Sequence, residues 1–358
     1  MKYSVLIDVR GEFMLCCAVD IRKIIYFFII LIIILLGGVC IYTYADDEIQ
    51  STEEEKKYIK WVDFNIPYEA LEKAMNIDIK SQKEEMKLNW IEILAHLSTK
   101  YGGDYKRYKA KDMDDIVAKI KDGKTAEEIT KNQTLYSYYI EAYTAVLGEF
   151  LGNYKIQTTS KDNPEEKIWV DKYGLKVFSP VARGYYYNHY DDFGVSRSYG
   201  YNRRHLGHDM MGSIGTPIIA IESGVVEAVG WNQYGGWRIG IRSFDKKRYY
   251  YYAHLRKDSP YHADIVEGKV VKAGDVIGYL GRTGYSVKEN VNNITQSHLH
   301  VGMQVIFDEV QKDGVNQIWI DFYAITKLLE KNRSYVMKNG KDFDRVYDFH
   351  EELLDNRV

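Results

Sequence analysis

Cysteine is scarce in this chain of 358 residues, and the three that it has, Cys16, Cys17 and Cys40, all lie near its start. No cysteine follows residue 46. Disulfide bonds therefore cannot stabilise the larger part of the chain, which excludes the small disulfide-rich scaffolds of many secreted proteins. Packing, with or without a bound metal, must stabilise that part instead.

An excess of positive charge is also missing. The formal net charge is -3 and the isoelectric point is near 6.3, so the chain has no overall basic field. General attraction to polyanions is thereby excluded, and we predict no nucleic-acid partner. The length exceeds what one hydrophobic core usually holds, which favours two soluble units besides any membrane segment.

One long uncharged run is present, over residues 24–44, and it is dense in isoleucine, leucine and phenylalanine. As a helix rising ~1.5 Å per residue it would span roughly 30 Å, the thickness of the apolar part of a bilayer. Arg22 and Lys23 directly precede it, so the positive-inside rule puts residues 1–23 in the cytoplasm as a short tail. We predict a single-pass anchor in the cell membrane, with everything from residue 46 outside the cell.

A cleaved signal peptide is the alternative interpretation of this run, because Thr43-Tyr44-Ala45 loosely fits a small-residue cleavage site. Cleavage would release the protein to the cell wall. The apolar run is longer than the about 7 to 15 residues of a typical signal peptide, which favours the uncleaved anchor.

Residues 46–154 are rich in Glu, Lys, Leu, Ile and Ala and poor in glycine, which predicts a small helical domain. Three sets of apolar residues recur there at helical spacing. They are Trp90, Ile91, Ile93, Leu94 and Leu97; Met113, Ile116, Val117 and Ile120; and Tyr136, Tyr139, Ile140, Tyr143, Val146 and Leu147. Thr125 and Glu128 have capping-box spacing, and His96 is interpreted as a packed histidine. This segment carries no chemistry, and docking of a protein partner is the role left open.

Residues 155–177 contain several turn-forming residues, and we predict a linker there. Most of the 28 glycines follow, together with short β-rich runs. The runs are 217–221, 224–229, 238–241, 248–255, 276–280 and 300–306. The pattern predicts an antiparallel β domain over residues 178–335, closed by a helix over 318–331. Residues 336–358 are predicted to form a polar tail.

The histidines carry the chemical signal. In His298-Leu299-His300 both imidazoles would share one face of a strand, because alternate side chains of a strand point the same way. His205 and Asp209 are four residues apart, a spacing that serves a common face in a strand or in a helix. Two histidines and one carboxylate from this set could therefore meet at one metal ion.

Two neutral imidazoles and one carboxylate around zinc leave a net +1 centre with an open fourth position, which is typical of a catalytic site. Water bound there can ionise near neutral pH. Spacing alone would also allow His208 to replace Asp209 as the ligand. The residues themselves do not decide which histidines bind the metal and which take part in catalysis without binding it. His254, at the end of a Tyr-Ala-His-Leu run, adds a further imidazole.

Several short motifs of residues 180–310 occur in a fixed order. They are Arg204-His205-Leu206-Gly207-His208-Asp209, Gly215-Thr216-Pro217, Gly224-Val225-Val226, Tyr252-Ala253-His254-Leu255, residues 271–278, Gly281-Arg282-Thr283-Gly284 and His298-Leu299-His300. In this order they resemble the lysostaphin/LytM family of zinc metallopeptidases. The resemblance implies a LytM-type (duplicated hybrid motif) β domain, and hence an α+β protein.

The resemblance also implies the roles of five residues. Zn²⁺ would be held by His205, Asp209 and His300, while His254 and His298 would be catalytic without binding the metal. In the family, metal-activated water attacks a peptide carbonyl, and histidine moves protons and helps to stabilise the oxyanion. The expected function is thus that of a zinc endopeptidase acting on peptide stems or cross-links of peptidoglycan.

Two features depart from the family pattern or narrow it. His208 stands where the family usually has an aliphatic residue, and residues 289–296 are longer than in many members. The helical segment, together with the tyrosine-rich segment 185–187 and the loop 281–296, resembles the sporulation-associated L-alanyl-D-glutamate endopeptidases. The alternative function, a degenerate LytM-type scaffold that binds the wall or a partner without cutting, would require loss of metal ligands.

Overall fold

The computed structural model describes residues 4–7, 13–16, 29–30, 32, 58–199, 201–314 and 316–355. The chain divides into two compact units, Met1–Tyr58 and Ile59–Val358. In the first, strands β1 (Ser4–Ile7) and β2 (Phe13–Cys16) pair as an antiparallel hairpin. Most of the predicted tail and anchor, and the alternative cleavage site, lie outside the described residues. Within the described part of the chain, no helix is both long enough and apolar enough to cross a membrane.

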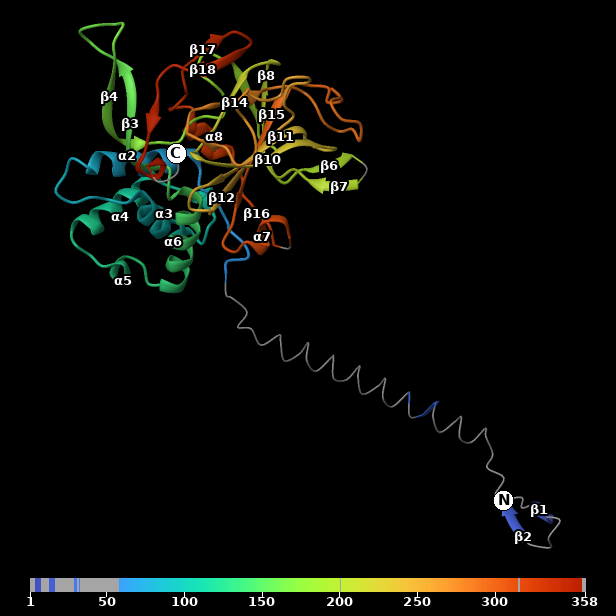
Figure 1. Ribbon diagram of the computed structural model, residues 1–358. Coiled ribbons are helices and arrows are strands. Elements are labelled where there is room, and N and C mark those ends of the chain that lie inside the picture. Colours follow the sequence, from blue (N-terminus) through green and yellow to red (C-terminus); the bar gives the residue numbers. More distant parts are fainter. Residues whose placement is uncertain are drawn as a thin grey trace. The chain divides into compact units, whose positions relative to one another are not determined.

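The second unit begins with the helical region that the apolar spacing predicts (Figure 1). Its elements are α2 (Tyr68–Ser81), α3 (Trp90–Tyr101), η1 (Tyr105–Arg107), α4 (Ala110–Lys121), α5 (Ala126–Ile129) and α6 (Gln133–Leu147). Asn89 caps α3 by accepting hydrogen bonds from two backbone amides of its first turn, and Gly102 ends it at φ 60°. The predicted capping box of Thr125 and Glu128 forms at the start of α5.

An antiparallel sheet follows, in the order β13-β10-β11-β12-β15-β8-β5, with β16 added beside β15. The strands are β5 (Tyr187–Tyr190), β8 (His208–Gly212), β10 (Gly224–Asn232), β11 (Gly236–Ser243), β12 (Arg248–Ala253), β13 (Val270–Val271), β15 (His298–Val305) and β16 (Ile318–Trp319). Two further antiparallel pairs are β6 (Ser196–Tyr199) with β7 (Tyr201–Arg204), and β9 (Pro217–Ile219) with β14 (Val276–Tyr279). The prediction of an antiparallel β domain after a helical region is confirmed.

The predicted linker at residues 155–177 is wrong. The segment forms a hairpin of β3 (Leu151–Thr159) and β4 (Lys167–Leu175), which extends from the rest of the unit (Figure 1). Its turn-forming residues make only the tip, where the Ser160 amide donates to the Glu166 carbonyl at 2.8 Å. Most side chains of both strands remain at least partly exposed, so a polar composition is compatible with a strand here.

The predicted polar tail at residues 336–358 is also wrong in its described part. Strands β17 (Val336–Asn339) and β18 (Asp342–Arg345) form a hairpin, and β19 (Phe349–His350) pairs with β3. Phe349 is fully buried, with its ring centroid 5.6 Å from that of Tyr154 and 5.7 Å from that of Phe178. The partly buried Val336 and Phe343 pack against the same apolar cluster as Phe349, and Leu354 is buried too. These scattered apolar residues give no periodic signal. The segment ends in η2 (Glu352–Leu354).

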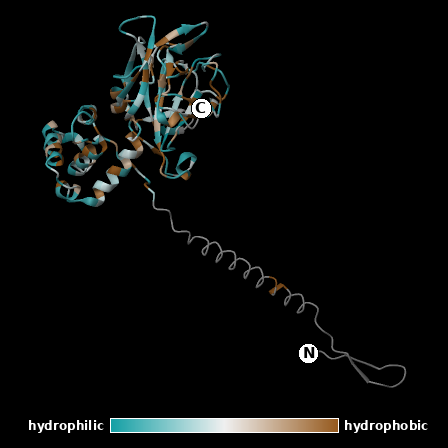
Figure 2. Ribbon diagram, turned by 60° about the vertical axis from the view of Figure 1, so that its left-hand side comes forward, coloured by the Kyte–Doolittle hydropathy of each residue, from teal (hydrophilic) through white to brown (hydrophobic). Residues whose placement is uncertain are grey.

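The closing helix is shorter than predicted. Residues 318–319 are strand β16, and α8 covers only Tyr323–Leu329, with a short α7 (Val310–Asp313) before it. The helical and β regions share one continuous set of buried apolar residues, so they form a single compact unit. Hydrophobic and hydrophilic residues alternate along its helices and strands (Figure 2).

Candidate metal centre

Two neighbouring strands bring the predicted ligands together. In the β8–β15 pair, Asp209 lies directly opposite His300, so the two side chains share one face of the sheet. His298 lies on the same face two residues earlier, and Leu299 between them is fully buried on the other face. His205 reaches this face from the turn that joins β7 to β8.

Three donor atoms converge there. His205 Nε2 is 3.1 Å from Asp209 Oδ1 and 2.9 Å from His300 Nδ1, and the last two atoms are 3.0 Å apart. Zinc–ligand distances of about 2.0 to 2.2 Å place tetrahedral donors roughly 3 to 3.5 Å apart, so these atoms fit that ion. Among the described residues this is the one group of three or more His, Cys, Asp or Glu side chains that could hold a metal.

The charges at this centre favour an ionised carboxylate. Burial by itself would raise the pKa of Asp209, but the adjacent imidazoles of His205 and His300 hold it far below its usual range. Burial lowers the pKa of His205, while Asp209 and Asp192 raise it more strongly, so the net shift is upward. Burial lowers the pKa of His300. Asp209 is therefore in the anionic form that a metal ligand needs.

Asp192 and Arg197, which no sequence motif indicates, contact two of these residues from the side away from the donor cluster. Asp192 Oδ1 lies 2.8 Å from His205 Nδ1, and the main-chain oxygen of Asp192 lies 3.3 Å from the same atom. Arg197 Nη2 donates to Asp209 Oδ2 at 3.0 Å and also contacts the Asp192 carboxylate. His205 Nε2 and Asp209 Oδ1 are thus left facing His300.

Backbone pairing explains why no spacing rule finds Asp192. The Gly194 amide donates to the His205 carbonyl at 2.7 Å, and the His205 amide donates to the Val195 carbonyl at 2.9 Å. These bonds align the segment before β6 with the turn after β7. The contact between Asp192 and His205 therefore depends on the hairpin of β6 and β7. In the sequence, Asp192 appears only as one of two consecutive aspartates.

His254 and His298 stand beside the three-atom cluster. Their ring centroids are 4.7 Å apart, and His298 Nε2 is 3.7 Å from Asp209 Oδ2. In both rings Nδ1 lies 2.9 Å from a main-chain carbonyl, that of Thr283 for His254 and that of Gln296 for His298. Nδ1–H therefore donates to the carbonyl, and Nε2 remains as an acceptor.

The backbone of His254 is itself unusual, because its φ of 61° lies in the left-handed region. The residue follows directly after β12, whose last residue Ala253 pairs with His300. Burial and the adjacent His298 and His300 hold the pKa of His254 well below its usual value, so this imidazole is neutral at neutral pH.

His208 does not join the cluster. Alternation along β8 turns it away from Asp209, and its Nε2 lies 2.7 Å from His189 Nδ1. His189 Nε2 in turn lies 2.5 Å from a carboxylate oxygen of Glu330. Burial and His189 lower the pKa of His208 to about 3. The interpretation of His208 as an alternative ligand therefore has no support in this geometry.

Position 207 requires a glycine, because the backbone there lies close to the imidazole of His300. A Cβ at this position would lie 2.5 Å from His300 Cε1 and 2.6 Å from its Nε2. Glycine lets the turn between His205 and Asp209 lie against the imidazole of His300.

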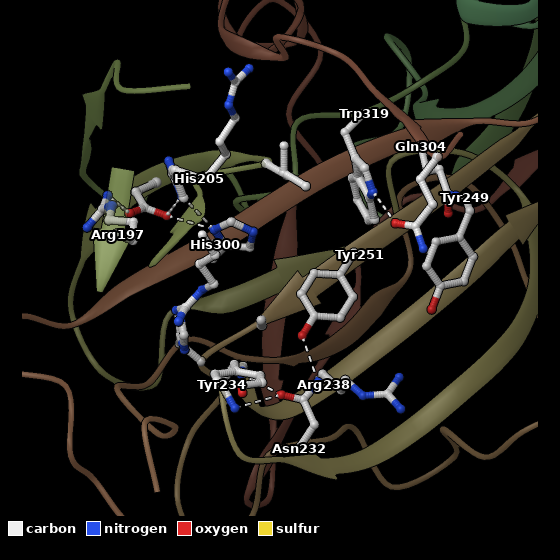
Figure 3. Close-up of a pocket in the computed structure, with 18 of the residues that line it drawn as sticks. Arg197, His205, Asn232, Tyr234, Arg238, Tyr249, Tyr251, His300, Gln304 and Trp319 are labelled. Atoms are coloured by element: carbon white, nitrogen blue, oxygen red, sulfur yellow. Dashed lines mark hydrogen bonds and ion pairs between the residues drawn. The ribbon is translucent and has the colours of Figure 1, made fainter. Parts of the chain in front are cut away.

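A groove of about 480 Å³ leads away from the cluster over the face of β11, β12 and β15 (Figure 3). Tyr251 and Trp319 form part of its wall, with ring centroids 6.3 Å apart. Beyond the cluster itself, its polar lining includes Arg203, Arg204, Asn232, Tyr234, Arg238, Tyr249, Tyr285, Gln304, Lys312, Asp313 and Gln317. The arrangement presents an extended surface of aromatic and basic side chains next to a metal-binding corner.

Comparison with known proteins agrees with this description. The sequence model of Peptidase family M23 matches residues 203–316, which include all five predicted site residues. The L-Ala--D-Glu endopeptidase of Bacillus subtilis (strain 168) is 38% identical over 124 residues, covering 35% of this chain and 36% of that protein. Glycyl-glycine endopeptidase ALE-1 of Staphylococcus capitis is 38% identical over 97 residues, covering 27% of this chain and 23% of that protein.

Among solved structures, the catalytic domain of the antimicrobial peptidase lysostaphin from Staphylococcus simulans matches at 32% identity, covering 39% of this chain and 92% of that chain, with a TM-score of 0.31. The site and the sequence matches define a metallopeptidase-type domain. Residues 203–316 of the chain form a Peptidase family M23 domain, as the motifs predict. It spans about a third of the Bacillus relative and less than a quarter of the Staphylococcus relative.

Proposed function

We propose that this protein is a zinc metalloendopeptidase that hydrolyses peptide bonds in the stems or cross-links of peptidoglycan. The observation that carries the proposal is the convergence of His205 Nε2, Asp209 Oδ1 and His300 Nδ1 beside two further histidines at one end of an aromatic groove. The M23 match and the printed activities of two relatives, an L-Ala--D-Glu endopeptidase and a glycyl-glycine endopeptidase, support it.

His205, Asp209 and His300 would hold the zinc ion. When bound, zinc would supply a Lewis acid that polarises a peptide carbonyl and lowers the pKa of water. Asp192 orients His205 by occupying its Nδ1 side, and Arg197 holds the outer oxygen of Asp209. These contacts keep the donor atoms turned toward one another before any substrate arrives.

His254 and His298 would accept a proton at Nε2, and the resulting N–H could then donate to the developing oxyanion or return the proton. Both present Nε2 as an acceptor, because their Nδ1–H groups are engaged by the carbonyls of Thr283 and Gln296. The lowered pKa of His254 keeps its imidazole neutral at neutral pH, so the lone pair of Nε2 is available to accept a hydrogen bond in the site. The left-handed backbone of His254 fixes the direction from which this imidazole enters the site.

The bond between L-alanine and D-glutamate is the first candidate for cleavage, because the Bacillus relative carries that activity in its name. A role in wall remodelling during sporulation goes with that assignment. We also propose that residues 24–44 anchor the protein in the cytoplasmic membrane and that its peptidase domain acts outside it, as the flanking charges favour.

The test is chemical. Zinc should be present near one ion per chain in the purified 358-residue protein, and purified wall digested with it should show new amino and carboxyl termini by mass spectrometry. New amino termini on D-glutamate would support the stem assignment, whereas new termini only at the cross-link would redirect it. A protein that binds the wall without zinc and without cutting it would be the non-catalytic scaffold instead.

A further inference from the structure

Two arginines in the groove have buried guanidinium nitrogens without an acceptor. Arg203 Nη1 and Arg238 Nε are buried and have no hydrogen-bond partner. Among residues that the structure describes, neither side chain has a carboxylate within ion-pair distance, whereas Arg197 is paired with both Asp192 and Asp209. A buried cationic donor without an acceptor is unfavourable, so both groups are suited to a ligand that brings an anion.

Arg203 is held rigidly close to the reaction centre. Its guanidinium carbon lies 4.9 Å from the ring centroid of Tyr234 and 5.0 Å from that of Tyr285. The Tyr285 ring is in turn 5.9 Å from that of His254. Tyr285 therefore contacts both this cation and a histidine of the site, so the cation lies one aromatic ring away from the candidate centre.

Arg238 extends the positive charge along the groove. It comes from β11, and Figure 3 shows it beyond Tyr251 as seen from His300. The carboxylates that line the groove are those of Asp209 and Asp313, and Asp209 is engaged by the metal-site residues. Lys312, the neighbour of Asp313 in the chain, is already paired with Glu227, with Nζ 2.5 Å from the carboxylate oxygen. The groove is thus basic over its length, and two of its guanidinium groups, those of Arg203 and Arg238, have a buried nitrogen left to bind a ligand.

We propose that Arg203, supported by Arg238, selects a wall peptide that carries a free carboxylate on the residue next to the scissile bond. The substrate is then an acidic stem peptide, and a neutral glycine bridge is a poor one. This inference rests on the proposed function and narrows it. It favours one of the two activities that the names of the relatives give, cleavage of an L-alanyl-D-glutamate bond over cleavage of a glycyl-glycine bond.

Three synthetic peptides test the selection with the zinc-loaded 358-residue protein. They are a stem peptide with an L-alanyl-D-glutamate bond and a free α-carboxylate, its twin with that carboxylate amidated, and pentaglycine. The kcat/KM for the acidic peptide should exceed that for the amidated twin by ~10- to 100-fold, the range of a hydrogen bond to a charged group. Calorimetry with the metal-free protein should show the same preference in Kd.

Variants of Arg203 test whether this residue causes the preference for the acidic peptide. Arg203→Gln should lose the preference by slowing the acidic peptide alone, and Arg203→Lys should restore part of it. Arg183→Gln is the matched control, because Arg183 also stacks on a tyrosine, 4.4 Å from the ring centroid of Tyr335, but does not line the groove. It should keep the wild-type preference.

The outcomes separate this inference from the proposed function. If the protein digests wall but cuts or binds the acidic and amidated peptides equally, or if Arg203→Gln slows both equally, the selection is wrong and the endopeptidase remains. If the zinc-loaded protein cuts neither wall nor any peptide, the proposed function fails, and a retained calorimetric preference would then show acidic-peptide binding alone.

Discussion

Asp192 Oδ1 lies 2.8 Å from Nδ1 of His205, on the side of the ring away from the atom that faces Asp209 and His300. The carboxylate is nearly buried, with a side-chain exposure of 10%, and Arg197 holds it in place. A carboxylate in this position fixes the tautomer of a metal-binding histidine and increases its basicity. In the proposed metal centre Asp192 would accordingly be a positioning residue.

Replacing Asp192 should therefore weaken metal binding. Asp192→Ala should lower zinc affinity by ~10- to 100-fold, measured by competition with a chromogenic chelator. Asp191→Ala is the control, since Asp191 is exposed and adjacent in the chain. Equal affinities for wild type and Asp192→Ala would show that the contact has no influence on the metal.

The two histidines of the His-Leu-His segment share a strand face but should differ in function. His300→Ala leaves two donor atoms, so zinc stoichiometry and activity should fall together. His298→Ala leaves all three donors, so zinc should stay near one per chain while kcat falls by ~10²- to 10⁴-fold, the range for a positioned acid or base. His254→Ala should behave like His298→Ala. Loss of zinc from His298→Ala and its retention in His300→Ala would reverse the assignment.

His208 offers a contrasting case on the opposite face of the same strand. His208→Ala should keep zinc near one per chain and retain activity, because its imidazole contacts His189 and not the donor cluster. Metal analysis and wall digestion on the same preparation would check both. Zinc loss from this variant would mean that β8 positions its residues differently in solution.

Local sequence patterns predicted the centre of this site well, for physical reasons. Strand alternation placed His298 and His300 on one face, and the strand pairing of β8 with β15 then brought Asp209 opposite. Asp192, Arg203 and Arg238 could not be found this way, because each reaches the site through a hairpin or a groove wall whose geometry depends on tertiary packing.

The errors in the fold have a similar cause. Hydrophobic periodicity identifies elements that bury a continuous face, and the hairpin of β3 and β4 buries little of either strand. The C-terminal strands are fixed by scattered apolar residues such as Phe349, which no periodic pattern reports. Besides the shared apolar core, Arg248 links the helical and β regions, although its place beside Lys246 and Lys247 is typical of a solvated surface.

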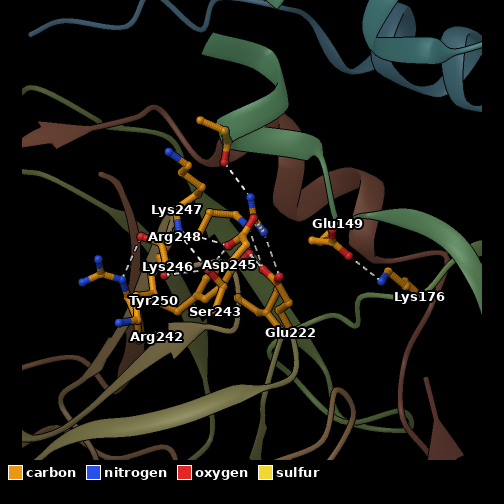
Figure 4. Close-up of polar contacts among 12 residues, drawn as sticks. Glu149, Lys176, Glu222, Arg242, Ser243, Asp245, Lys246, Lys247, Arg248 and Tyr250 are labelled. Atoms are coloured by element: carbon orange, nitrogen blue, oxygen red, sulfur yellow. Dashed lines mark hydrogen bonds and ion pairs between the residues drawn. The ribbon is translucent and has the colours of Figure 1, made fainter. Parts of the chain in front are cut away.

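Arg248 is fully buried and joins the two regions (Figure 4). Its Nη1 donates to the carbonyl of Ala145 in α6 at 2.7 Å, and its Nε and Nη2 donate to the carboxylate of Glu222 at 2.8 and 3.0 Å. Arg248→Met should lower the free energy of unfolding by about 3 to 5 kcal/mol, because it leaves Glu222 buried and unpaired. Urea denaturation measures this. The double variant Arg248→Met/Glu222→Gln should recover much of the loss, and an additive loss instead would contradict the pairing argument.

Acid should destabilise the helical region through His96. This side chain is 1% exposed, its Nδ1 lies 2.7 Å from Thr130 Oγ1, its Nε2 has no hydrogen-bond partner, and its ring stacks on Tyr136 at 4.2 Å. Burial lowers the pKa of His96 from 6.5 to about 4. Between these values the unfolded chain binds a proton that the folded chain does not, so stability is present above pH 6.5 and falls as the pH approaches 4.

The difference in pKa corresponds to a loss of up to about 3 kcal/mol from this one group. His96→Phe preserves an aromatic ring against Tyr136 and removes the titration. The free energy of unfolding of His96→Phe, measured by urea denaturation at pH 7, 6, 5 and 4, should fall less steeply with acid than that of the wild type. The variant also removes the partner of Thr130, so the slope against pH is compared and not the value at pH 7. His350→Phe is the control, because the His350 side chain is 37% exposed. Parallel curves for wild type and His96→Phe would show that His96 takes up its proton without unfolding the region around it.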